Sequence, residues 1–349
     1  MVDLAVIGAG PAGCATAIWA AARGLNVLLV ERSQFPRFRP GECLHPGIEV
    51  LFRDLGVFDK VLEKSSVRPS TRTVISEGCR SVESFGVDDN GPWQALHVSR
   101  ADLDAILLTR AQQLGVTLHI HRSRVIPISS NGKIEGVEFD GRIFRCAFVV
   151  DASGQGAWLT RSLGRKYLPA SPCLTAFYGY CHGHLPEGQL FEASTAGWQW
   201  MAQVSADVVN WTSLHFGVHQ KPLPPATMSS LSSCGRNGGA DVTWRIAPSV
   251  AGPSFFITGD AAFVTDPACG NGVLRAVMSG IKAAYNARAI LTGQATQAEA
   301  AQDYRTWMKH WFEADTAQLT HLYETLRKDW RAPNSLAITQ HPAFELKSI

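Results

Sequence analysis

The sequence predicts an α/β protein that combines a nucleotide-binding parallel sheet with a second, antiparallel sheet, and three observations lead to this prediction. Residues 4–31 contain two short apolar runs that flank a glycine turn and a helical segment, which is the order of a strand–helix–strand unit. Asn131-Gly132 and Asp140-Gly141 lie between β-rich segments and predict two hairpins, because both central residues of a type I′ turn need positive φ. Residues 166–218 are aromatic-rich and β-like, and predict further antiparallel strands.

The glycine turn has the spacing of a dinucleotide-binding site. Gly8 permits the tight turn, Gly10 lets the backbone approach a pyrophosphate, and Gly13 lets helix and strand pack closely. The free N–H groups and the dipole at the helix start favour the phosphate charge. Glu31 ends the second apolar run, where its carboxylate can accept hydrogen bonds from a ribose diol. The alternative is a glycine turn that only connects a strand to a helix.

The remaining elements are predicted from periodicity and turn residues. The hairpins imply an antiparallel meander over roughly 124–146, and residues 147–150 then predict a buried parallel strand. Residues 220–241 are rich in Pro, Ser and Gly and predict a mobile connection. The other predicted elements are helices over 48–55, 101–114, 273–291 and 297–330, and strands over 72–76, 95–98, 116–120 and 254–258.

Composition excludes several classes of protein. The chain has 349 residues, 46% hydrophobic and 18% charged, with a net charge of +2, so it can bury a large core but shows no nucleic-acid signature. No membrane span and no basic leader are found, which predicts a cytoplasmic protein. The eight cysteines contain no CxxC motif, and the paired histidines at 119/121 and 182/184 have no further ligand at metal-site spacing. We therefore expect reduced thiols and no metal.

Four segments together resemble group A flavoprotein monooxygenases, whose FAD domain is of the glutathione-reductase type. They are residues 8–31, Ser99 to Asp104, Val150 to Gly154 with Arg161, and Gly259-Asp260 through Gly272. The resemblance implies non-covalent FAD, with Asp260 at the ribityl or pyrophosphate part and the following loop and helix start at the negatively charged edge of the reduced flavin. The cofactor-binding residues expected in addition to Gly8, Gly10, Gly13 and Glu31 are Arg32, Arg39, Arg100, Asp151, Gly154, Gly259, Asp260, Pro267, Gly270 and Gly272.

Residues 36–44 narrow the resemblance to the halogenase and geranylgeranyl-reductase branch, where a Gly-Glu pair sits beside the flavin. The candidate catalytic residues are therefore Glu42, Cys43 and His45, with Trp198 and Trp200 from a Trp-x-Trp segment that lines either a pocket or a sheet core. Ala202-Gln203 stands where halogenases carry Ile-Pro, and no Lys occurs between Lys64 and Lys133 to direct hypohalous acid, which argues against halogenation. The segment 41–46 and the compact length also resemble the flavoproteins that hydroxylate a tryptophan in tryptophylquinone enzymes.

The resemblance implies an FAD-dependent monooxygenase that hydroxylates an electron-rich aromatic substrate, a small molecule or a protein-bound tryptophan, through a flavin C4a-hydroperoxide formed from O2. Electrons would come from NAD(P)H or from a separate flavin reductase. The alternatives are a flavin-dependent reductase of an isoprenoid double bond and a non-catalytic FAD-binding partner protein. The expected domains are an FAD-binding domain (1–65, 100–165 and 245–295), a β-sheet substrate domain (66–99 and 166–244) and a C-terminal helical segment (296–349).

Overall fold

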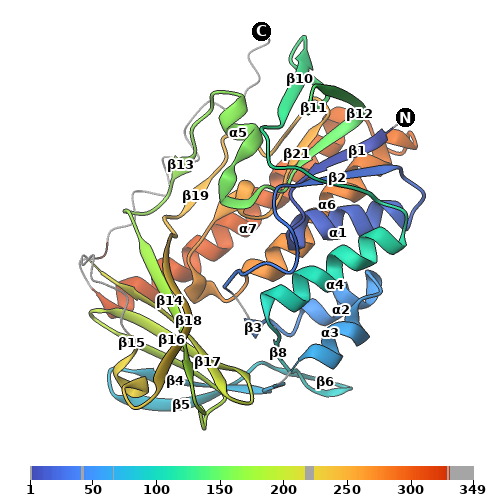
Figure 1. Cartoon of the computed structure of the whole chain (residues 1–349). Coiled ribbons are helices and arrows are strands. Elements are labelled where there is room, and N and C mark those ends of the chain that lie inside the picture. Colours follow the sequence, from blue (N-terminus) through green and yellow to red (C-terminus); the bar gives the residue numbers. More distant parts are fainter. Residues whose placement is uncertain (1, 41–42, 66, 217–223, 328–329, 331–349) are drawn as a thin grey trace.

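Two large sheets organise the chain in the computed structural model, which describes residues 2–40, 43–65, 67–216, 224–327 and 330 (Figure 1). The fold is mixed α/β, as predicted. The eight-stranded sheet has the order β10-β11-β12-β1-β2-β9, with β21 beside β12 and β20 beside β21. Its strands are β1 (Val2–Ile7), β2 (Val27–Glu31), β9 (Thr117–Ile120), β10 (Ile126–Ser130), β11 (Lys133–Phe139), β12 (Arg142–Asp151), β20 (Ala251–Gly252) and β21 (Phe255–Ile257).

Strand β12 joins the predicted meander to the parallel part of this sheet. Its first half pairs antiparallel with β11, and its second half pairs parallel with both β1 and β21. The predicted buried parallel strand over 147–150 is confirmed, and it forms the second half of one ten-residue strand that begins in the meander. The two hairpin turns are confirmed: φ is 49° and 74° at Asn131 and Gly132, and 51° and 66° at Asp140 and Gly141.

Helices α1 (Pro11–Ala21), α4 (Arg100–Gln113) and α6 (Gly272–Leu291) cover one face of the eight-stranded sheet (Figure 1). Helix α1 is buried almost throughout and packs directly on α6. A Cβ at Gly280 would lie 2.2 Å from the Ala12 carbonyl oxygen, so the two backbones touch. Thr16 Oγ1 donates to the Gly280 carbonyl oxygen at 3.1 Å and joins the helices by a hydrogen bond. This contact fixes the start of α6 relative to the glycine turn.

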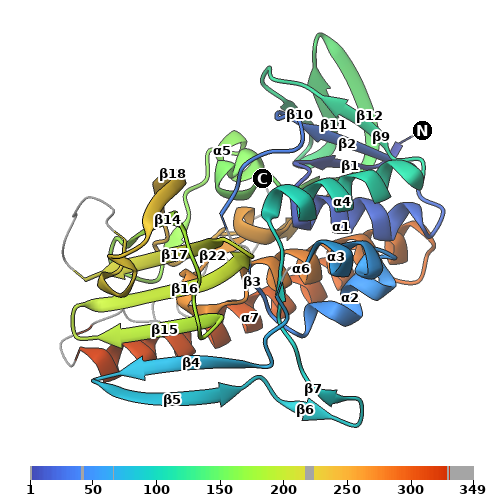
Figure 2. The same ribbon diagram turned by 60° about the horizontal axis from the view of Figure 1, so that its bottom comes forward.

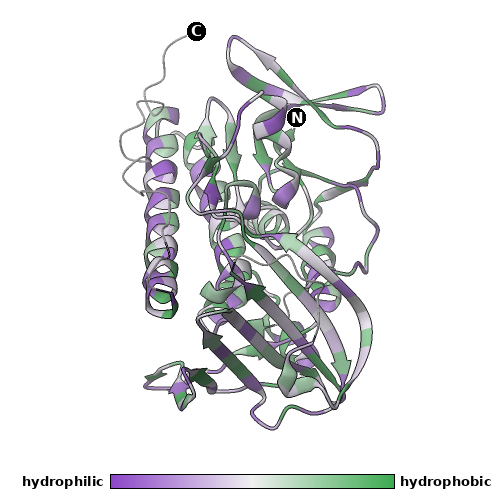
Figure 3. Cartoon of the chain, turned by 90° about the vertical axis from the view of Figure 1, so that its left-hand side faces the viewer, coloured by the Kyte–Doolittle hydropathy of each residue, from purple (hydrophilic) through white to green (hydrophobic). Residues whose placement is uncertain are grey.

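The seven-stranded sheet has the order β18-β14-β17-β16-β15-β4-β5 and collects segments that are far apart in sequence. Strand β4 pairs parallel with β15, while the other neighbours are antiparallel. The strands are β4 (Thr71–Ser76), β5 (Cys79–Ser84), β14 (Thr175–His182), β15 (Gln189–Ser194), β16 (Gly197–Ser205), β17 (Val208–His215) and β18 (Ser232–Asp241). Figure 3 shows that many residues of the strands are apolar, whereas polar and apolar residues alternate along the helices.

The predicted mobile connection over 220–241 was wrong for most of its length. Residues 232–241 form β18, which pairs with β14 at the sheet edge, and Ala226–Met228 form a short 3₁₀ turn. The glycines that suggested a loop allow this strand to lie close to aromatic neighbours, since a Cβ at Gly238 would meet the Tyr178 hydroxyl at 2.6 Å. The first residues of this segment, 220–223, lie outside the described residues.

The remaining elements connect and cover the two sheets (Figures 1 and 2). In both views, the two-stranded sheet of β3 and β8 lies between the seven-stranded sheet and the helices of the other sheet. Within the described residues, no helix is long and apolar enough to cross a membrane. The elements are β3 (Cys43–Leu44), β6 (Val87–Asp88), β7 (Gly91–Pro92), β8 (Leu96–His97), β13 (Leu168–Pro169), β19 (Arg245–Ile246), β22 (Phe263–Val264), α2 (Ile48–Asp54), α3 (Phe58–Lys64), α5 (Trp158–Ser162) and α7 (Gln297–Leu326), with 3₁₀ turns at Gly154–Gly156, Gly259–Ala261 and Pro267–Cys269.

Candidate active site

The three glycines of the turn between β1 and α1 differ in their backbone conformation and in the space available for a side chain. Gly8 has φ +105°, and a Cβ there would lie 2.4 Å from the Ala152 carbonyl oxygen. A Cβ at Gly13 would lie 1.8 Å from the Gly8 carbonyl oxygen. Gly10 has an ordinary φ of −77°, and its Cβ would meet only the Arg37 Nη2 atom at 3.5 Å. The fold therefore requires Gly8 and Gly13, whereas Gly10 borders open space at the start of α1, where a phosphate fits.

Glu31 ends β2 beside this turn, and its carboxylate is almost fully buried. Oε2 accepts from the Ala9 N–H at 2.8 Å and pairs with Arg37 Nη1 at 3.0 Å. Oε1 accepts from the N–H groups of Arg32 and Ser33, each at 2.9 Å. The carboxylate thus ties the glycine turn to the loop after β2. A ribose diol at this place would share these oxygens.

An arginine cluster lies next to this carboxylate. Arg37 Nε lies 3.3 Å from the buried Asp104, whose other oxygen accepts from Arg100 Nε at 3.0 Å. Arg100 also donates to the Pro40 carbonyl oxygen at 3.4 Å, which anchors the loop after β2 to the start of α4. Partial burial and the neighbouring guanidinium groups of Arg37, Arg32 and Arg100 lower the pKa of the Arg39 guanidinium. Such a surplus of positive charge suits an anionic ligand.

Asp151 and Gly154 shape the loop after β12. The buried Asp151 carboxylate accepts from the N–H groups of Ser153 at 2.9 Å and of Leu159 at 2.8 Å, and burial raises its pKa. Gly154 has φ +63°, and a Cβ there would meet no other atom within 4 Å. The structure thus places Asp151 as the internal brace of this loop, whereas Gly154 borders open space.

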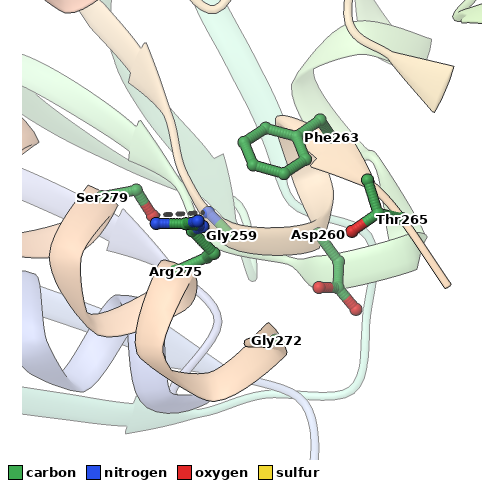
Figure 4. A pocket seen from close by; sticks show the side chains of 7 residues that line it. All are labelled: Gly259, Asp260, Phe263, Thr265, Gly272, Arg275 and Ser279. Atoms are coloured by element: carbon green, nitrogen blue, oxygen red, sulfur yellow. Dashed lines mark hydrogen bonds between the residues drawn. The ribbon is translucent and has the colours of Figure 1, made fainter. Parts of the chain in front are cut away.

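Gly259 and Asp260 follow β21 and face the start of α6 around a hollow of about 40 Å³ (Figure 4). Gly259 has φ +57°, and its N–H donates to Ser279 Oγ of α6 at 3.0 Å. The Asp260 side chain remains exposed to solvent although protein surrounds it on several sides. This surrounding protein raises the pKa of Asp260, and the positive charges of Arg100 and Arg245 partly oppose that rise. No hydrogen bond joins its carboxylate to a residue that the structure describes.

The loop from Asp266 to Gly272 leads from this hollow into α6. Asp266 Oδ1 accepts from the Ala268 N–H at 2.8 Å, and this bond starts the 3₁₀ turn at Pro267. Gly270 has φ +68°, and a Cβ at Gly270 or Gly272 would meet no atom within 4 Å. The first N–H groups of α6 therefore border open space. A helix start of this kind stabilises negative charge.

Helix α7 holds this loop from behind, which the sequence did not reveal. The Tyr323 hydroxyl donates to Asp266 Oδ2 and accepts from Trp198 Nε1, the latter at 2.8 Å. Trp244 Nε1 also lies 3.4 Å from Asp266 Oδ2. Burial raises the pKa of Asp266 to about 6, although these hydrogen bonds oppose the rise. The side chains of these four residues, Asp266, Tyr323, Trp198 and Trp244, are buried.

A second contact from α7 reaches the first turn of α6. Asp315 forms two hydrogen bonds with Arg275, at 2.7 and 3.2 Å, and the Arg275 guanidinium lies 3.6 Å from the ring centroid of Trp311. Arg275 is one of the residues that line the hollow at Asp260 (Figure 4). Two residues of α7, Asp315 and Tyr323, thus set the shape of the segment between Asp266 and Arg275.

The candidate catalytic residues of the loop before α2 are only partly visible. Glu42 lies outside the described residues. Cys43 lies on β3, and its Sγ atom is 3.1 Å from Nε2 of His97, a buried residue that sequence reasoning missed. His45 is exposed, and its Nδ1 accepts from the Gly47 N–H at 3.0 Å. Burial together with the charges of Arg275 and Arg72 lowers the pKa of His45.

The two tryptophans of the Trp-x-Trp segment lie on the same face of β16 but in different surroundings. Trp198 is 1% exposed and packs in the sheet core against Phe191, with its Nε1 bonded to Tyr323. Trp200 is half-buried and pairs in register with Phe191 and Thr212 of the neighbouring strands. The structure therefore places Trp198 in the core and leaves Trp200 as the candidate for a substrate-facing wall.

A family model decides the identity of this architecture. The model of a family described as "FAD binding domain" matches residues 1–178, about half of the chain. The chain belongs to this FAD-binding family. The match contains the glycine turn, Glu31, the arginine cluster and Asp151, but ends before Gly259 and α7.

Curated relatives place this FAD-binding protein among flavin-dependent oxidoreductases. It is 28% identical over 315 residues to a 1H-pyrrole-2-carbonyl-(peptidyl-carrier protein) brominase of Pseudoalteromonas luteoviolacea, covering 81% of this chain and 76% of the relative. It is 27% identical over 317 residues to a menaquinone reductase of Mycolicibacterium smegmatis, covering 78% of this chain and 72% of the relative. A tryptophan 2-halogenase of Chondromyces crocatus is 27% identical over 340 residues, covering 86% of this chain and 63% of the relative.

Solved structures show the same fold at lower sequence identity. The flavin-dependent halogenase CmlS has a TM-score of 0.82 at 21% identity, covering 97% of this chain and 69% of that chain. The probable FAD-dependent monooxygenase PqsL of Pseudomonas aeruginosa has a TM-score of 0.78 at 15% identity, covering 93% of this chain and 96% of that chain. This FAD-binding protein is an enzyme of the FAD-dependent oxidoreductase class, in the superfamily that contains monooxygenases and halogenases.

The residues present fit FAD. Open space at Gly10 borders the helix start where a pyrophosphate would bind, and the arginine cluster supplies positive charge beside it. The exposed Asp260 carboxylate supplies a further polar group, and Gly270 and Gly272 border open space at the start of α6, which packs on α1. Phosphate, sugar and flavin would thus each meet groups of suitable charge.

Proposed function

We propose that this enzyme is a monooxygenase that places one oxygen atom on an electron-rich aromatic substrate. The observation that carries the proposal is a row of successive register partners on β15, β16, β17 and β14 of the seven-stranded sheet. This aromatic row consists of three aromatic residues, Phe191, Trp200 and Tyr178, with Thr212 between Trp200 and Tyr178. All four are half-buried. Aromatic side chains offer flat apolar surface to an aromatic ring.

The aromatic row lies on the sheet face that looks toward the presumed cofactor loops. Trp198 and Leu214 lie on the same face, and Trp198 reaches the Asp266 loop through Tyr323. Phe38, from the loop after β2, contacts Tyr178 and Tyr180 at centroid distances of 6.2 and 5.8 Å. A substrate against this row would lie between the sheet and the start of α6. When bound there, FAD supplies the activation of O2 for oxygen transfer.

Lysine positions support hydroxylation over halogenation. Halogenases of the resembled branch use a lysine to direct hypohalous acid, and the relatives named above include a brominase. No described residue on a strand of the seven-stranded sheet is a lysine. Lys282 and Lys309 lie on α6 and α7, where they pair with Asp303 and Glu313. Among the described residues, the strands that form the aromatic row thus carry no lysine of the kind used by halogenases.

Oxygen incorporation decides between these reactions. The FAD-loaded enzyme would receive NAD(P)H, with or without a separate flavin reductase, together with ¹⁸O2, bromide and chloride. The aromatic panel would include phenols, indoles, free tryptophan and tryptophan peptides. We expect a product that is heavier by one ¹⁸O atom. If the tryptophylquinone resemblance extends to the substrate, tryptophan peptides should be turned over faster than free tryptophan. A halogen isotope pattern in the product would refute the proposal. Stoichiometric H2O2 without any product would refute it for these substrate classes.

A second candidate is reduction of a carbon–carbon double bond. It is favoured by the similarity to the menaquinone reductase of Mycolicibacterium smegmatis. A reductase would reoxidise its reduced flavin under anaerobic conditions when an isoprenoid alcohol without a quinone ring is added, and its product would gain two hydrogens at a carbon–carbon double bond and no oxygen. The monooxygenase proposed here would leave the reduced flavin unchanged in that experiment.

A further inference from the structure

Cys43 and His97 form a thiol–imidazole pair whose parts come from separate segments. They are register partners in the small antiparallel sheet of β3 and β8, and Cys43 Sγ lies 3.1 Å from His97 Nε2. The other ring nitrogen, Nδ1, lies 2.7 Å from the Gln203 carbonyl oxygen on β16. His97 is fully buried, while Cys43 is only half-buried. The imidazole is therefore closed to an incoming molecule, whereas part of the Cys43 surface is exposed.

The carbonyl partner determines where the imidazole proton lies. A carbonyl oxygen only accepts, so Nδ1 must carry the hydrogen that it donates to Gln203. Burial lowers the pKa of His97, which favours the neutral ring; the contacts with Gln203 and Gln189 oppose this in part. In a neutral ring with Nδ1–H, Nε2 is an acceptor. The Cys43 thiol then donates its hydrogen to Nε2.

The surroundings of Nε2 are also suited to the protonated ring. The Gln189 side chain lies beside the imidazole, and its Oε1 atom is buried without a partner among the described residues. A buried acceptor without a partner costs free energy. A proton on Nε2 would give this region one more donor between the sulfur and Gln189. The Gln203 carbonyl oxygen at Nδ1 and the Gln189 side chain beside the ring thus both favour the imidazolium form.

The pair lies beside the aromatic row of the substrate-facing sheet. Gln189 and Gln203 flank the row on β15 and β16, with Gln189 two residues from Phe191 and Gln203 three residues from Trp200. On the other side, a Cβ at Gly47 would lie 3.9 Å from Leu274 of α6, so the segment that begins with Cys43 reaches the first turn of that helix. The segment from Cys43 to Gly47 thus runs from the His97 contact near the sheet to the helix start expected beneath the flavin.

We propose that Cys43 and His97 act as the proton acceptor for the substrate ring during hydroxylation, an assignment that rests on the proposed function. After an oxygen atom has been added to a ring carbon, that carbon still bears its original hydrogen. The C–H bond breaks, its electron pair returns to the ring, and the proton goes to Cys43 Sγ. The proton that Sγ carried moves to His97 Nε2. The pair holds one added proton as imidazolium and releases it when the product leaves.

The pair can be tested without any substrate by measuring alkylation of individual cysteines. The full-length FAD-loaded enzyme would be treated with iodoacetamide between pH 5.5 and 9.5, and each cysteine would be followed by peptide mass spectrometry. Because sulfur reacts as the thiolate and His97 Nε2 can accept the thiol hydrogen during the attack, we expect Cys43 to react at least tenfold faster at pH 7 in the parent enzyme than in His97→Gln. Glutamine can still donate to the Gln203 carbonyl but cannot accept a proton. The exposed Cys79 on β5 is the internal reference and should react equally in both proteins. Equal alkylation rates of Cys43 in the parent enzyme and in His97→Gln would show that the two residues do not act as a thiol–imidazole pair.

The proton step can be tested with a substrate deuterated at the reacting carbon. In the parent enzyme we expect loss of the ring proton to be fast, with no primary isotope effect on single-turnover product formation. In Cys43→Ala and His97→Gln this step should slow about 100-fold, the scale of general-base catalysis, and a primary isotope effect should appear. Cys79→Ser is the matched control and should behave as the parent. A merely structural role would lower the rate without an isotope effect, and that result would overturn the assignment.

The two experiments separate failure of this inference from failure of the proposed function. If the parent enzyme hydroxylates its substrate while the variants show neither change, the proton-acceptor role is wrong and the function stands. If the parent hydroxylates nothing in the panel, both the function and the role are refuted for these substrates. The alkylation result then still decides whether the thiol–imidazole pair exists. Because His97 is buried, the thermal unfolding and flavin absorbance of each variant would be recorded first, and a misfolded His97→Gln would be replaced by His97→Asn.

Discussion

Replacing Gly10 by Val should remove FAD from the enzyme while leaving the protein folded. The backbone at Gly10 has φ −77° and ψ −175°, which any residue adopts, and the nearest atom to an added Cβ is Arg37 Nη2 at 3.5 Å. The remaining cost is a poorer residue at the helix N-cap, about 1 kcal/mol. For a protein of this size, that cost lowers the melting temperature by roughly 3 °C or less.

The effect on the cofactor is much larger, because the valine side chain fills the space that we assign to the pyrophosphate. Forced overlap of a few atoms in a packed site costs roughly 3 kcal/mol. At about 1.4 kcal/mol per tenfold change in affinity, FAD binding should weaken by at least about 100-fold. Yellow colour should therefore be lost during purification, and equilibrium dialysis with added FAD would measure the remaining affinity.

Gly13→Ala is the matched control, since it changes a glycine of the same turn that the fold itself requires. Its Cβ would lie 1.8 Å from the Gly8 carbonyl oxygen, and α1 would have to move away from β1. We expect Gly13→Ala to lower the unfolding free energy of the apoprotein by about 3 kcal/mol or more. Full FAD occupancy in Gly10→Val, or a normal apoprotein melting curve in Gly13→Ala, would refute the reading of this turn.

Three further predictions concern the groups around the Asp266 loop and the thiols. Tyr323→Phe leaves Trp198 Nε1 without its acceptor and removes one of the three donors to the buried Asp266 carboxylate, so it should cost about 2–4 kcal/mol in urea unfolding. Tyr304→Phe should cost about 1 kcal/mol, because its hydroxyl donates to a neutral carbonyl, and equal losses would contradict this. Burial raises the pKa of Asp266 from 3.8 to about 6, so the folded state binds the extra proton and stability should fall by about 3 kcal/mol as the pH rises through that window. Asp266→Asn should lack this part of the pH profile, and identical profiles would show that Asp266 does not titrate there. Thiol titration of the denatured, unreduced protein should find all eight cysteines, and a shortfall of two would reveal a disulfide.

Features determined by neighbouring residues could be predicted from the sequence. The turn at Gly8 and the hairpins at Asn131 and Asp140 depend on backbone conformations that only a few residue types adopt, and the structure has the expected positive φ at each. The opposite case is β18, where glycines that suggested a loop form a strand. Local propensity favours a turn there, but pairing with β14 and the room needed by Tyr178 decide the outcome.

Site residues could be predicted from the sequence where the cofactor-binding motif lies within one short segment. They could not be predicted where the interacting side chains are far apart in the sequence. The sequence indicated Cys43 but not His97, since the two are 54 positions apart and an isolated histidine carries no signal. Asp266 and Tyr323 are 57 positions apart, and nothing in the helical periodicity of α7 marks the tyrosine as a loop anchor. The spacing of Trp198 and Trp200 correctly predicted that both side chains lie on the same face of the sheet. The spacing could not predict which of the two rings is buried by other residues.

The anchoring of the Asp266 loop by α7 has a consequence for the order of events during synthesis. A nascent chain leaves the ribosome from its N-terminus, so the glycine turn and Glu31 are exposed long before Asp315 and Tyr323 exist. Until those residues arrive, the segment from Asp266 to Arg275 lacks the two side chains that fix its shape. The dinucleotide half of the cofactor thus has a place to bind early, whereas the flavin half must wait. We therefore expect complete FAD binding to follow the synthesis of α7, because only then are Asp315 and Tyr323 present to hold the segment.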